Sequence, residues 1–298
     1  MKQYMPSQGT EPDGGTTTVE PPTLTADDLL VLDTDAFPDE AVAIVTGAGS
    51  GIGRATSLAL LSNEVTVAGV DIDEEGMAET ADRAASFDLP GTFSDIDADL
   101  TDDDDLDIAV AQASELGDVR YLANIAGMQH IAPLADFPMD RYDLLVDLMV
   151  RAPFGLSKRV MPLIEETDDG KGAIANMSSV HGHVATRDKS AYITAKHALN
   201  GLTRAIAAEG DGHIRGFSVS VGYVMTPLMA EQIAETAEQR GITEQAVVED
   251  VMLGKSQTKR MMTPAEVANL FVFGLSRHGE HLNGGDLLWD GGFTTTYE

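Results

Sequence analysis

Tyr192 and Lys196 stand four residues apart in the segment SAYITAK (190–196). Residues at this spacing share one face of an α-helix, so a helix here would place a phenol beside an ammonium group. A free phenol has a pKa near ~10, and a neighbouring ammonium favours the phenolate and can lower that pKa. The pair therefore predicts proton exchange with a substrate oxygen, and the hydroxyl of Ser179 can hold the same oxygen.

A glycine-rich turn gives a second indication of chemistry. The segment TGAGSGIG (46–53) follows a continuous apolar run and precedes a stretch with helical periodicity. Residues without side chains let backbone N–H groups approach a pyrophosphate, and the N-terminus of the following helix adds a partial positive charge. A glycine cluster alone often marks an ordinary loop, but its placement here favours a dinucleotide site. The residues that we assign to this site are Gly47, Ser50, Gly51, Ile52 and Gly53.

Asp71 ends the next predicted strand and indicates which dinucleotide binds. A carboxylate at this place can accept hydrogen bonds from the ribose hydroxyls of NAD, whereas it would repel the 2′-phosphate of NADP. Arg54 directly follows the turn and can contact a phosphate, which keeps NADP open. Asp71 can also be one more surface acid in an acidic chain.

The two signals together indicate an oxidoreductase that moves a hydride between NAD and a small alcohol or ketone. A Tyr-x-x-x-Lys pair by itself can be an ordinary solvated helix face. That alternative weakens because the same chain carries a dinucleotide turn upstream.

Apolar runs alternate with amphipathic stretches from Ala41 onward. The run AVAIVTG (41–47) is continuous, which suits a strand buried on both faces. Strands that alternate with helices imply a doubly wound parallel α/β sheet in one domain, residues 39–298. The predicted strands are 41–47, 65–70, 93–97, 119–124, 172–177, 217–221 and 286–289, and the predicted helices are 52–61, 103–116, 139–166 and 191–209.

Residues 1–38 differ in texture, because they are rich in Pro, Gly, Thr and acids. We expect an acidic, largely disordered extension with at most one short helix near Thr25–Leu32.

The charge balance excludes several partners. Asp and Glu total 49 against 19 Lys plus Arg, a net charge of -30. Such a surface repels nucleic acids and anionic membranes. In molar salt the screening length falls to about 3 Å and the self-repulsion of the chain largely disappears. The composition resembles that of proteins from salt-accumulating halophiles; an acidic mesophilic enzyme is the alternative.

The remaining composition points to a soluble, cytoplasmic protein without a metal. The 298 residues include no cysteine, which excludes a disulfide framework, a thiolate metal site and a thiol nucleophile. No apolar run approaches the ~20 residues of a membrane-spanning helix, and the start of the chain lacks the apolar core of a signal peptide.

Over roughly residues 40–293 the chain resembles the short-chain dehydrogenase/reductase family. The match rests on the turn at 46–53, on an Asn-x-Ala-Gly segment at 124–127, and on Ser179 with Tyr192 and Lys196. The resemblance implies a Rossmann core of about seven parallel strands, a Ser–Tyr–Lys catalytic set and a homotetramer. The further cofactor residues that it implies are Asp99 and Leu100 at the adenine end, then Asn124, Ala126 and Gly127, with Tyr192 and Lys196, and Val224 and Thr226 at the nicotinamide carboxamide.

Within that family the chain is similar to the 3-hydroxybutyrate dehydrogenase branch. The similar segments are GMQHIAP (127–133), DFP (136–138), KSAY (189–192), GYVMTPL (222–228) and DGGF (290–293). The similarity implies a short β-hydroxy or β-keto acid, most simply 3-hydroxybutyrate or acetoacetate, whose carboxylate would contact Gln129, His181, Lys189 and Gln232. Residues 226–254 are expected to form a small helical lid over this substrate.

Lys189 suits a carboxylate partner, because lysine is scarce in this negative chain. It can equally form a surface ion pair, and His181 can be a neutral hydrogen-bonding residue without a substrate role.

Met149 departs from the family pattern, since it stands where a helix asparagine is usual. A thioether accepts hydrogen bonds only weakly, so a proton relay through Lys196 would be impaired or rewired. Two alternatives remain: a relative that acts on another hydroxyl (a sugar, a polyol or a 3-oxoacyl thioester), and a non-catalytic NAD-binding sensor.

Overall fold

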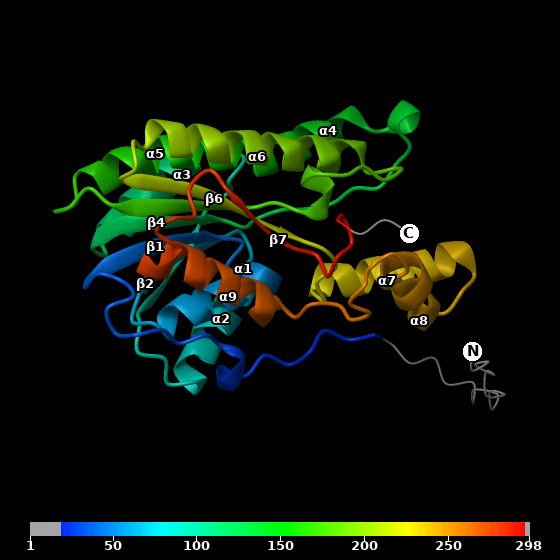
Figure 1. The fold of residues 1–298 in the computed structure, drawn as a ribbon, viewed down its shortest axis with the longest axis horizontal. Coiled ribbons are helices and arrows are strands. Elements are labelled where there is room, and N and C mark those ends of the chain that lie inside the picture. The colour runs from blue at the N-terminus through cyan, green and yellow to red at the C-terminus, as the bar shows by residue number, and fades with distance from the viewer. Residues whose placement is uncertain (1–18, 296–298) are drawn as a thin grey trace, which may run out of the picture.

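Seven parallel strands form one sheet with helices on both faces (Figure 1). The computed structural model describes residues 19–295. The strands lie in the order β3-β2-β1-β4-β5-β6-β7, and each pairs in parallel with its neighbours. This is the predicted doubly wound, Rossmann-type sheet. The strands are β1 (Ala41–Thr46), β2 (Thr66–Asp71), β3 (Phe93–Asp97), β4 (Asp118–Asn124), β5 (Gly172–Met177), β6 (Ile214–Val221) and β7 (Asp286–Trp289).

The helices form two outer layers. One face of the sheet carries α1 (Gly51–Leu61), α2 (Glu74–Ser86) and α9 (Pro264–Leu275). The other face carries α3 (Asp103–Ser114), α4 (Met139–Val146), α5 (Ala152–Glu165) and α6 (Ser190–Glu209). Two further helices, α7 (Pro227–Arg240) and α8 (Glu244–Ala246), lie beside the sheet rather than over it (Figure 1). Short helical turns occur at Ala26–Asp28 (η1), Leu134–Asp136 (η2), Asp147–Arg151 (η3), Val180–Gly182 (η4), Val247–Met252 (η5) and Arg277–Gly279 (η6).

The alternation of side chains along β1 builds both halves of the core. Ala43 and Val45 join the cluster under α1 and α9, whereas Val42 and Ile44 join the cluster under α3, α5 and α6. All six residues of β1 are buried, which explains why the strand is apolar on both faces.

The stretch predicted as one helix over 139–166 consists of α4 and α5 separated by η3, a π-helical turn. Pro153 lies where α5 continues from η3, so its missing N–H removes one hydrogen bond from a continuous helical backbone at the π-helical turn. Helical periodicity cannot reveal such a turn, because a π-turn adds one residue to an otherwise continuous pattern.

Residues 19–38 pack against the domain, contrary to the prediction that residues 1–38 form a largely disordered extension. Residues 1–18 lie outside the described residues. Leu29, Ala36 and Phe37 are buried in the core cluster under α1 and α9. The Leu30 N–H donates to Asn269 Oδ1 at 2.8 Å, and the Leu32 N–H donates to Asn63 Oδ1 at 2.8 Å. Composition did not predict this packing, because a few apolar residues among Pro, Thr and acids suffice to hold a segment against an existing core.

The segment predicted as a lid is helical. It contains α7, α8 and η5, and its apolar side chains form a cluster of their own. The predicted helix η1 near Thr25 is a single 3-10 turn with a capping box. Within residues 19–295, no helix is long and apolar enough to cross a membrane.

Candidate active site

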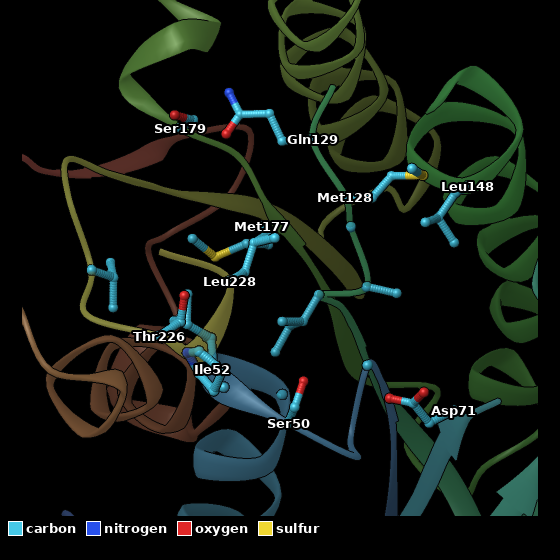
Figure 2. A pocket seen from close by; sticks show the side chains of 18 of the residues that line it. Ser50, Ile52, Asp71, Met128, Gln129, Leu148, Met177, Ser179, Thr226 and Leu228 are labelled. Atoms are coloured by element: carbon cyan, nitrogen blue, oxygen red, sulfur yellow. The ribbon is translucent and has the colours of Figure 1, made fainter. Parts of the chain in front are cut away.

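A cavity of about 500 Å³ holds most of the predicted site residues (Figure 2). Ser179, Tyr192 and Lys196 line it, as do Gln129 and Gln232. The predicted cofactor residues that line it are Gly47, Ser50, Gly51, Ile52, Gly53, Asp71, Asp99, Leu100, Ala126, Gly127, Val224 and Thr226. Asn124, His181 and Lys189 are not among its lining residues.

The turn between β1 and α1 requires glycine at defined positions. Gly47 has φ +73° and Gly51 has φ +50°, a region that side chains disfavour. A Cβ on Gly53 would lie 2.0 Å from the carbonyl oxygen of Gly47, so helix and turn can approach only with glycine there.

The first turn of α1 opens onto the cavity. Its N-cap residue Ser50 makes no side-chain capping hydrogen bond, and Gly51, Ile52 and Gly53 of that turn all line the cavity. Uncapped N–H groups and the positive end of a helix fit a pyrophosphate. The turn therefore fits a dinucleotide.

Asp71 lies at the end of β2, where its carboxylate faces the glycine turn (Figure 2). Its Oδ2 accepts from the Gly49 N–H at 2.9 Å, and its Oδ1 accepts from the Asp73 N–H at 3.1 Å. Two backbone donors fix the carboxylate at the rim, and the remaining lone pairs can accept from ribose hydroxyls.

Arg54 is not among the lining residues of the cavity, and its guanidinium has four partners. It donates to the carbonyl oxygens of Gly49 and Gly76 and to Thr80 Oγ1, and it pairs with Glu79 at 2.8 Å. A guanidinium with these partners has no free donor edge for a 2′-phosphate.

Thr46 was not identified from the sequence, although it positions the loop beside the turn. Its Oγ1 accepts from the N–H groups of Ile125 and Ala126 at 2.9 and 3.0 Å. Its place directly before the first glycine of the turn is the signal that could have identified it. The role of Thr46 is therefore to hold β1 and the end of β4 together.

Asn124 lies in the sheet rather than at the cavity wall. Its Nδ2 donates to Asn176 Oδ1 at 2.9 Å, and Asn176 Nδ2 donates to Thr203 Oγ1 at 3.0 Å. This buried chain ties β4, β5 and α6 together below the site.

The catalytic candidates meet where β5 ends and α6 begins. Tyr192 and Lys196 share a face of α6, and the Lys196 Nζ lies 5.3 Å from the centroid of the Tyr192 ring. The Lys196 Nζ also donates to the carbonyl oxygen of Met177 at 2.7 Å. Ser179 follows β5 and hydrogen-bonds the Tyr192 hydroxyl. The side chains of Ser179 and Tyr192 thus face the same part of the cavity.

Burial controls the protonation of this pair. It raises the pKa of Tyr192, and the hydrogen bond with Ser179 opposes that rise. Burial also lowers the pKa of Lys196 to about 8. Burial thus shifts the phenol pKa upward, opposite to the lowering expected from the spacing of Tyr192 and Lys196. At neutral pH Tyr192 holds its proton.

His181 and Lys189 lie outside the lining of the cavity. The His181 ring packs edge-on against Tyr192, with centroids 5.8 Å apart, and its Nε2 lies 3.0 Å from Thr186 Oγ1. Burial, and then the charge of Lys189, lower the pKa of His181 to about 4. Lys189 forms no ion pair with any residue of the described range 19–295. The surface ion pair offered as its alternative role is thus not found.

Gln129 and Gln232 join the loop after β4 to α7. Gln232 Nε2 donates to Gln129 Oε1 at 2.8 Å. The Nε2 of Gln129 is buried and has no hydrogen-bond partner among residues 19–295. Gln129 thus keeps an unused amide donor, buried beside the cavity that Ser179 also lines (Figure 2).

Val224 and Thr226 close the cavity at the start of α7. Val224 bridges to Met262, and Thr226 Oγ1 caps α7 by accepting from the Met229 N–H at 3.2 Å.

Met149 is fully buried in η3 and packs with Ala191 and Ala195 of α6. Met149 therefore packs as an apolar side chain. Its thioether is only a weak hydrogen-bond acceptor, as expected from the sequence, and cannot replace the amide of an asparagine.

The fold and this site define a nicotinamide-dinucleotide oxidoreductase, and comparison with known proteins agrees. Residues 41–237 match the short chain dehydrogenase family. The chain belongs to that family.

Individual relatives act on different alcohols. D-beta-hydroxybutyrate dehydrogenase of Rhizobium meliloti is 33% identical over 256 residues, which cover 85% of this chain and 98% of that protein. Cyclohexanol dehydrogenase of an Acinetobacter species is 32% identical, with 85% and 95% covered. The crystal structure of a short-chain type dehydrogenase/reductase from Mycobacterium marinum superposes with a TM-score of 0.78 at 26% identity, covering 88% of this chain and 98% of that one.

Proposed function

We propose that the protein is an NAD-dependent dehydrogenase of short 3-hydroxy acids, with 3-hydroxybutyrate and acetoacetate as its substrate pair. The observation that carries this proposal is the buried, unpartnered amide nitrogen of Gln129 on the cavity wall. A buried donor without a partner costs about 1–3 kcal/mol, and a substrate carboxylate would remove that cost. An alcohol without an acceptor beyond the reacting carbon would leave it in place.

The residues divide the reaction between them. Tyr192 holds a proton on its hydroxyl at neutral pH, so it can deliver that proton to the oxygen of a keto acid as the alcohol forms. Ser179, which hydrogen-bonds the phenol, orients the same oxygen. Lys196 is anchored on Met177 beside the phenol ring and supplies positive charge as the phenol loses its proton. The reduced dinucleotide, when bound along the glycine turn, would supply the hydride to the carbonyl carbon, and its oxidised form would accept a hydride in the reverse reaction.

NAD is preferred over NADP in this proposal because of Asp71 and Arg54. The Asp71 carboxylate stands at the ribose end of the cavity, and Arg54 is committed to Gly49, Gly76 and Glu79. A 2′-phosphate would therefore meet a negative charge without a cation to offset it.

Further parts of the proposal concern assembly and surroundings. We propose that α7, α8 and η5 act as a lid, since Gln232 on α7 already contacts the cavity wall opposite. A homotetramer and a cytoplasmic, salt-rich setting are proposed from the family and from the net charge of -30.

The experiment is a substrate panel followed by absorbance of the reduced nicotinamide, in low and molar salt, with NAD and NADP in parallel. The panel contains 3-hydroxybutyrate, its uncharged amide, 2-butanol and cyclohexanol. We expect 3-hydroxybutyrate with NAD to give the highest kcat/KM. Turnover of 2-butanol or cyclohexanol at the same kcat/KM would contradict the substrate class, and no turnover of any compound would favour the NAD-binding sensor.

Lys189→Ala sharpens the same test. Lys189 lies close enough to His181 to lower its pKa and has no carboxylate partner among the described residues 19–295. We therefore expect its removal to raise KM for the acid and to leave NAD binding intact. Lys158→Ala, on the exposed face of α5, is the matched control.

A further inference from the structure

A polar cluster outside the cavity joins the turn that carries Ser179 to the edge of the sheet. The cluster consists of His183, Ser218, Ser220 and Asp286. Ser218 and Ser220 lie in β6 and are 2% and 0% exposed. Buried strands of a parallel sheet are normally apolar, so two hydroxyls on one face of β6 need hydrogen-bond partners.

His183 and Asp286 supply these partners. The His183 Nε2 lies 2.9 Å from Asp286 Oδ2 and 3.1 Å from Ser220 Oγ. Asp286 Oδ1 accepts from Ser218 Oγ at 2.7 Å. Because a carboxylate only accepts, Nε2 must carry the hydrogen that His183 shares with Asp286. The imidazole is thus held from two strands at once.

The turn between Ser179 and His183 is short and stiff. Ser179 is the N-cap of η4 and His183 is its C-cap, with only Val180–Gly182 between them. The Gly182 N–H donates to the Ser179 carbonyl at 2.8 Å, and the His181 N–H donates to Ser179 Oγ at 3.2 Å. A displacement of His183 is therefore passed to the Ser179 hydroxyl across one helical turn.

The opposite side of η4 is fixed by α6. Asn200 Nδ2 donates to the Gly182 carbonyl at 3.1 Å, and a Cβ on Gly182 would lie 2.7 Å from Asn200 Nδ2. The turn η4 is therefore held on one side by Asn200 of α6 and on the other by the hydrogen bonds of His183 to Ser220 and Asp286. Without the second anchor it could pivot about Asn200.

We propose that His183, held between Ser220 and Asp286, is a positioning residue that fixes the Ser179 hydroxyl for the reaction. The role rests on the proposed function, since it assumes that Ser179 holds the substrate oxygen. His183 itself touches neither substrate nor cofactor.

The test compares His183→Ala with His183→Gln, whose amide nitrogen can occupy the place of Nε2, and with Asp286→Asn, which can accept through only one atom. His281→Ala, an exposed histidine, is the control. Each variant is measured for kcat, for KM, for dinucleotide affinity and for amide hydrogen exchange over residues 178–184 and 41–61.

For His183→Ala we expect kcat to fall roughly tenfold, since a misplacement of about 1 Å can cost about a hundredfold. Dinucleotide affinity should not change, and exchange should rise over 178–184 but not over 41–61. His183→Gln should restore most of kcat and of the exchange protection, and Asp286→Asn should resemble His183→Ala.

Two results would overturn the positioning role. One is an unchanged kcat in His183→Ala together with unchanged exchange over 178–184. The other is a rise in exchange over both segments that His183→Gln does not reverse, which would show a general loss of structure. The exchange measurement needs no substrate, so it stays decisive even where 3-hydroxy acids are not turned over and the proposed function fails.

Discussion

The proposed dinucleotide end of the cavity and its proposed substrate end present different groups to a ligand. The dinucleotide end consists mainly of backbone: a glycine turn, an uncapped helix start and one carboxylate fixed by two N–H groups. The substrate end consists of side chains from separate segments, for example Gln129 and Gln232, which are 103 residues apart. Backbone geometry tolerates few substitutions, whereas a set of side chains can be exchanged. Relatives of similar identity are named for a hydroxy acid and for cyclohexanol, as exchange of side chains at one end of a cavity would allow.

The largest expected effect falls where the two ends meet. In Tyr192→Phe the proton donor is lost while the ring remains, so kcat should fall about a thousandfold, within the usual range of general acid–base catalysis. Dinucleotide affinity should stay the same, as measured by titration of protein fluorescence. Tyr142→Phe, which changes a partly buried tyrosine on α4 outside the cavity lining, is the control. A Tyr192→Phe protein with the original kcat would mean that the phenol does no chemistry.

At the dinucleotide end, Gly53→Ala should disturb binding before anything else. The added Cβ would lie 2.0 Å from the Gly47 carbonyl oxygen, so the turn must shift, at a cost of about 1–3 kcal/mol. The readouts are the Kd for NAD and the melting temperature. Gly201→Ala on α6 is the matched control, because no atom lies within 4 Å of its added Cβ, and it should stabilise the protein by about 0.5–1 kcal/mol. An unchanged Kd for NAD in Gly53→Ala would refute the proposal that dinucleotide binding depends on the backbone geometry of this turn.

At the substrate end, Gln232→Leu should change specificity alone. It removes the donor that orients Gln129, a hydrogen bond worth about 0.5–1.5 kcal/mol, so KM for 3-hydroxybutyrate should rise about threefold to tenfold. KM for NAD should not change, and neither should KM for 2-butanol. Gln245→Leu, an exposed residue of α8, serves as the control. Equal increases for acid and alcohol would show that α7 acts on the whole cavity instead.

A last effect concerns the free energy of unfolding rather than binding, and it comes from Lys196. Burial lowers its pKa to about 8, below its ordinary value of 10.5, so at pH 7 the charged side chain opposes folding. Lys196→Met removes a cost of about 3 kcal/mol but leaves the Met177 carbonyl without its donor, so the free energy of unfolding should rise by only about 1–2 kcal/mol.

The stability difference between Lys196→Met and the parent protein should depend on pH. As pH rises from about 8 towards 10.5, the folded lysine loses its proton before the unfolded one does, so the advantage of the variant should shrink. Urea unfolding at pH 7 and pH 10 measures it, with Lys158→Met as the exposed control. A variant less stable than the parent at pH 7 would contradict the burial cost.

The sequence predicted the fold and the dinucleotide end better than the substrate end, for a physical reason. The sheet and the glycine turn depend on local patterns, such as the buried run of β1 and the short segment 46–53. The orientation of Gln129 depends on a residue of α7, and the raised pKa of Tyr192 depends on burial by the whole domain. The π-turn η3 and the contacts of residues 19–38 were also invisible, because both arise from packing and not from periodicity.

The amino-terminal segment links parts of the molecule that are far apart in sequence. The Val19 N–H donates to Glu244 of α8 at 2.7 Å, while Phe37 packs edge-on against Tyr121 of β4. Since the family match begins only at residue 41, a protein trimmed to that boundary would uncover Tyr121 and remove the hydrogen bond to Glu244 of α8. One stretch of chain outside the family match thus contacts both α8 and β4, so its removal would affect two distant parts of the molecule.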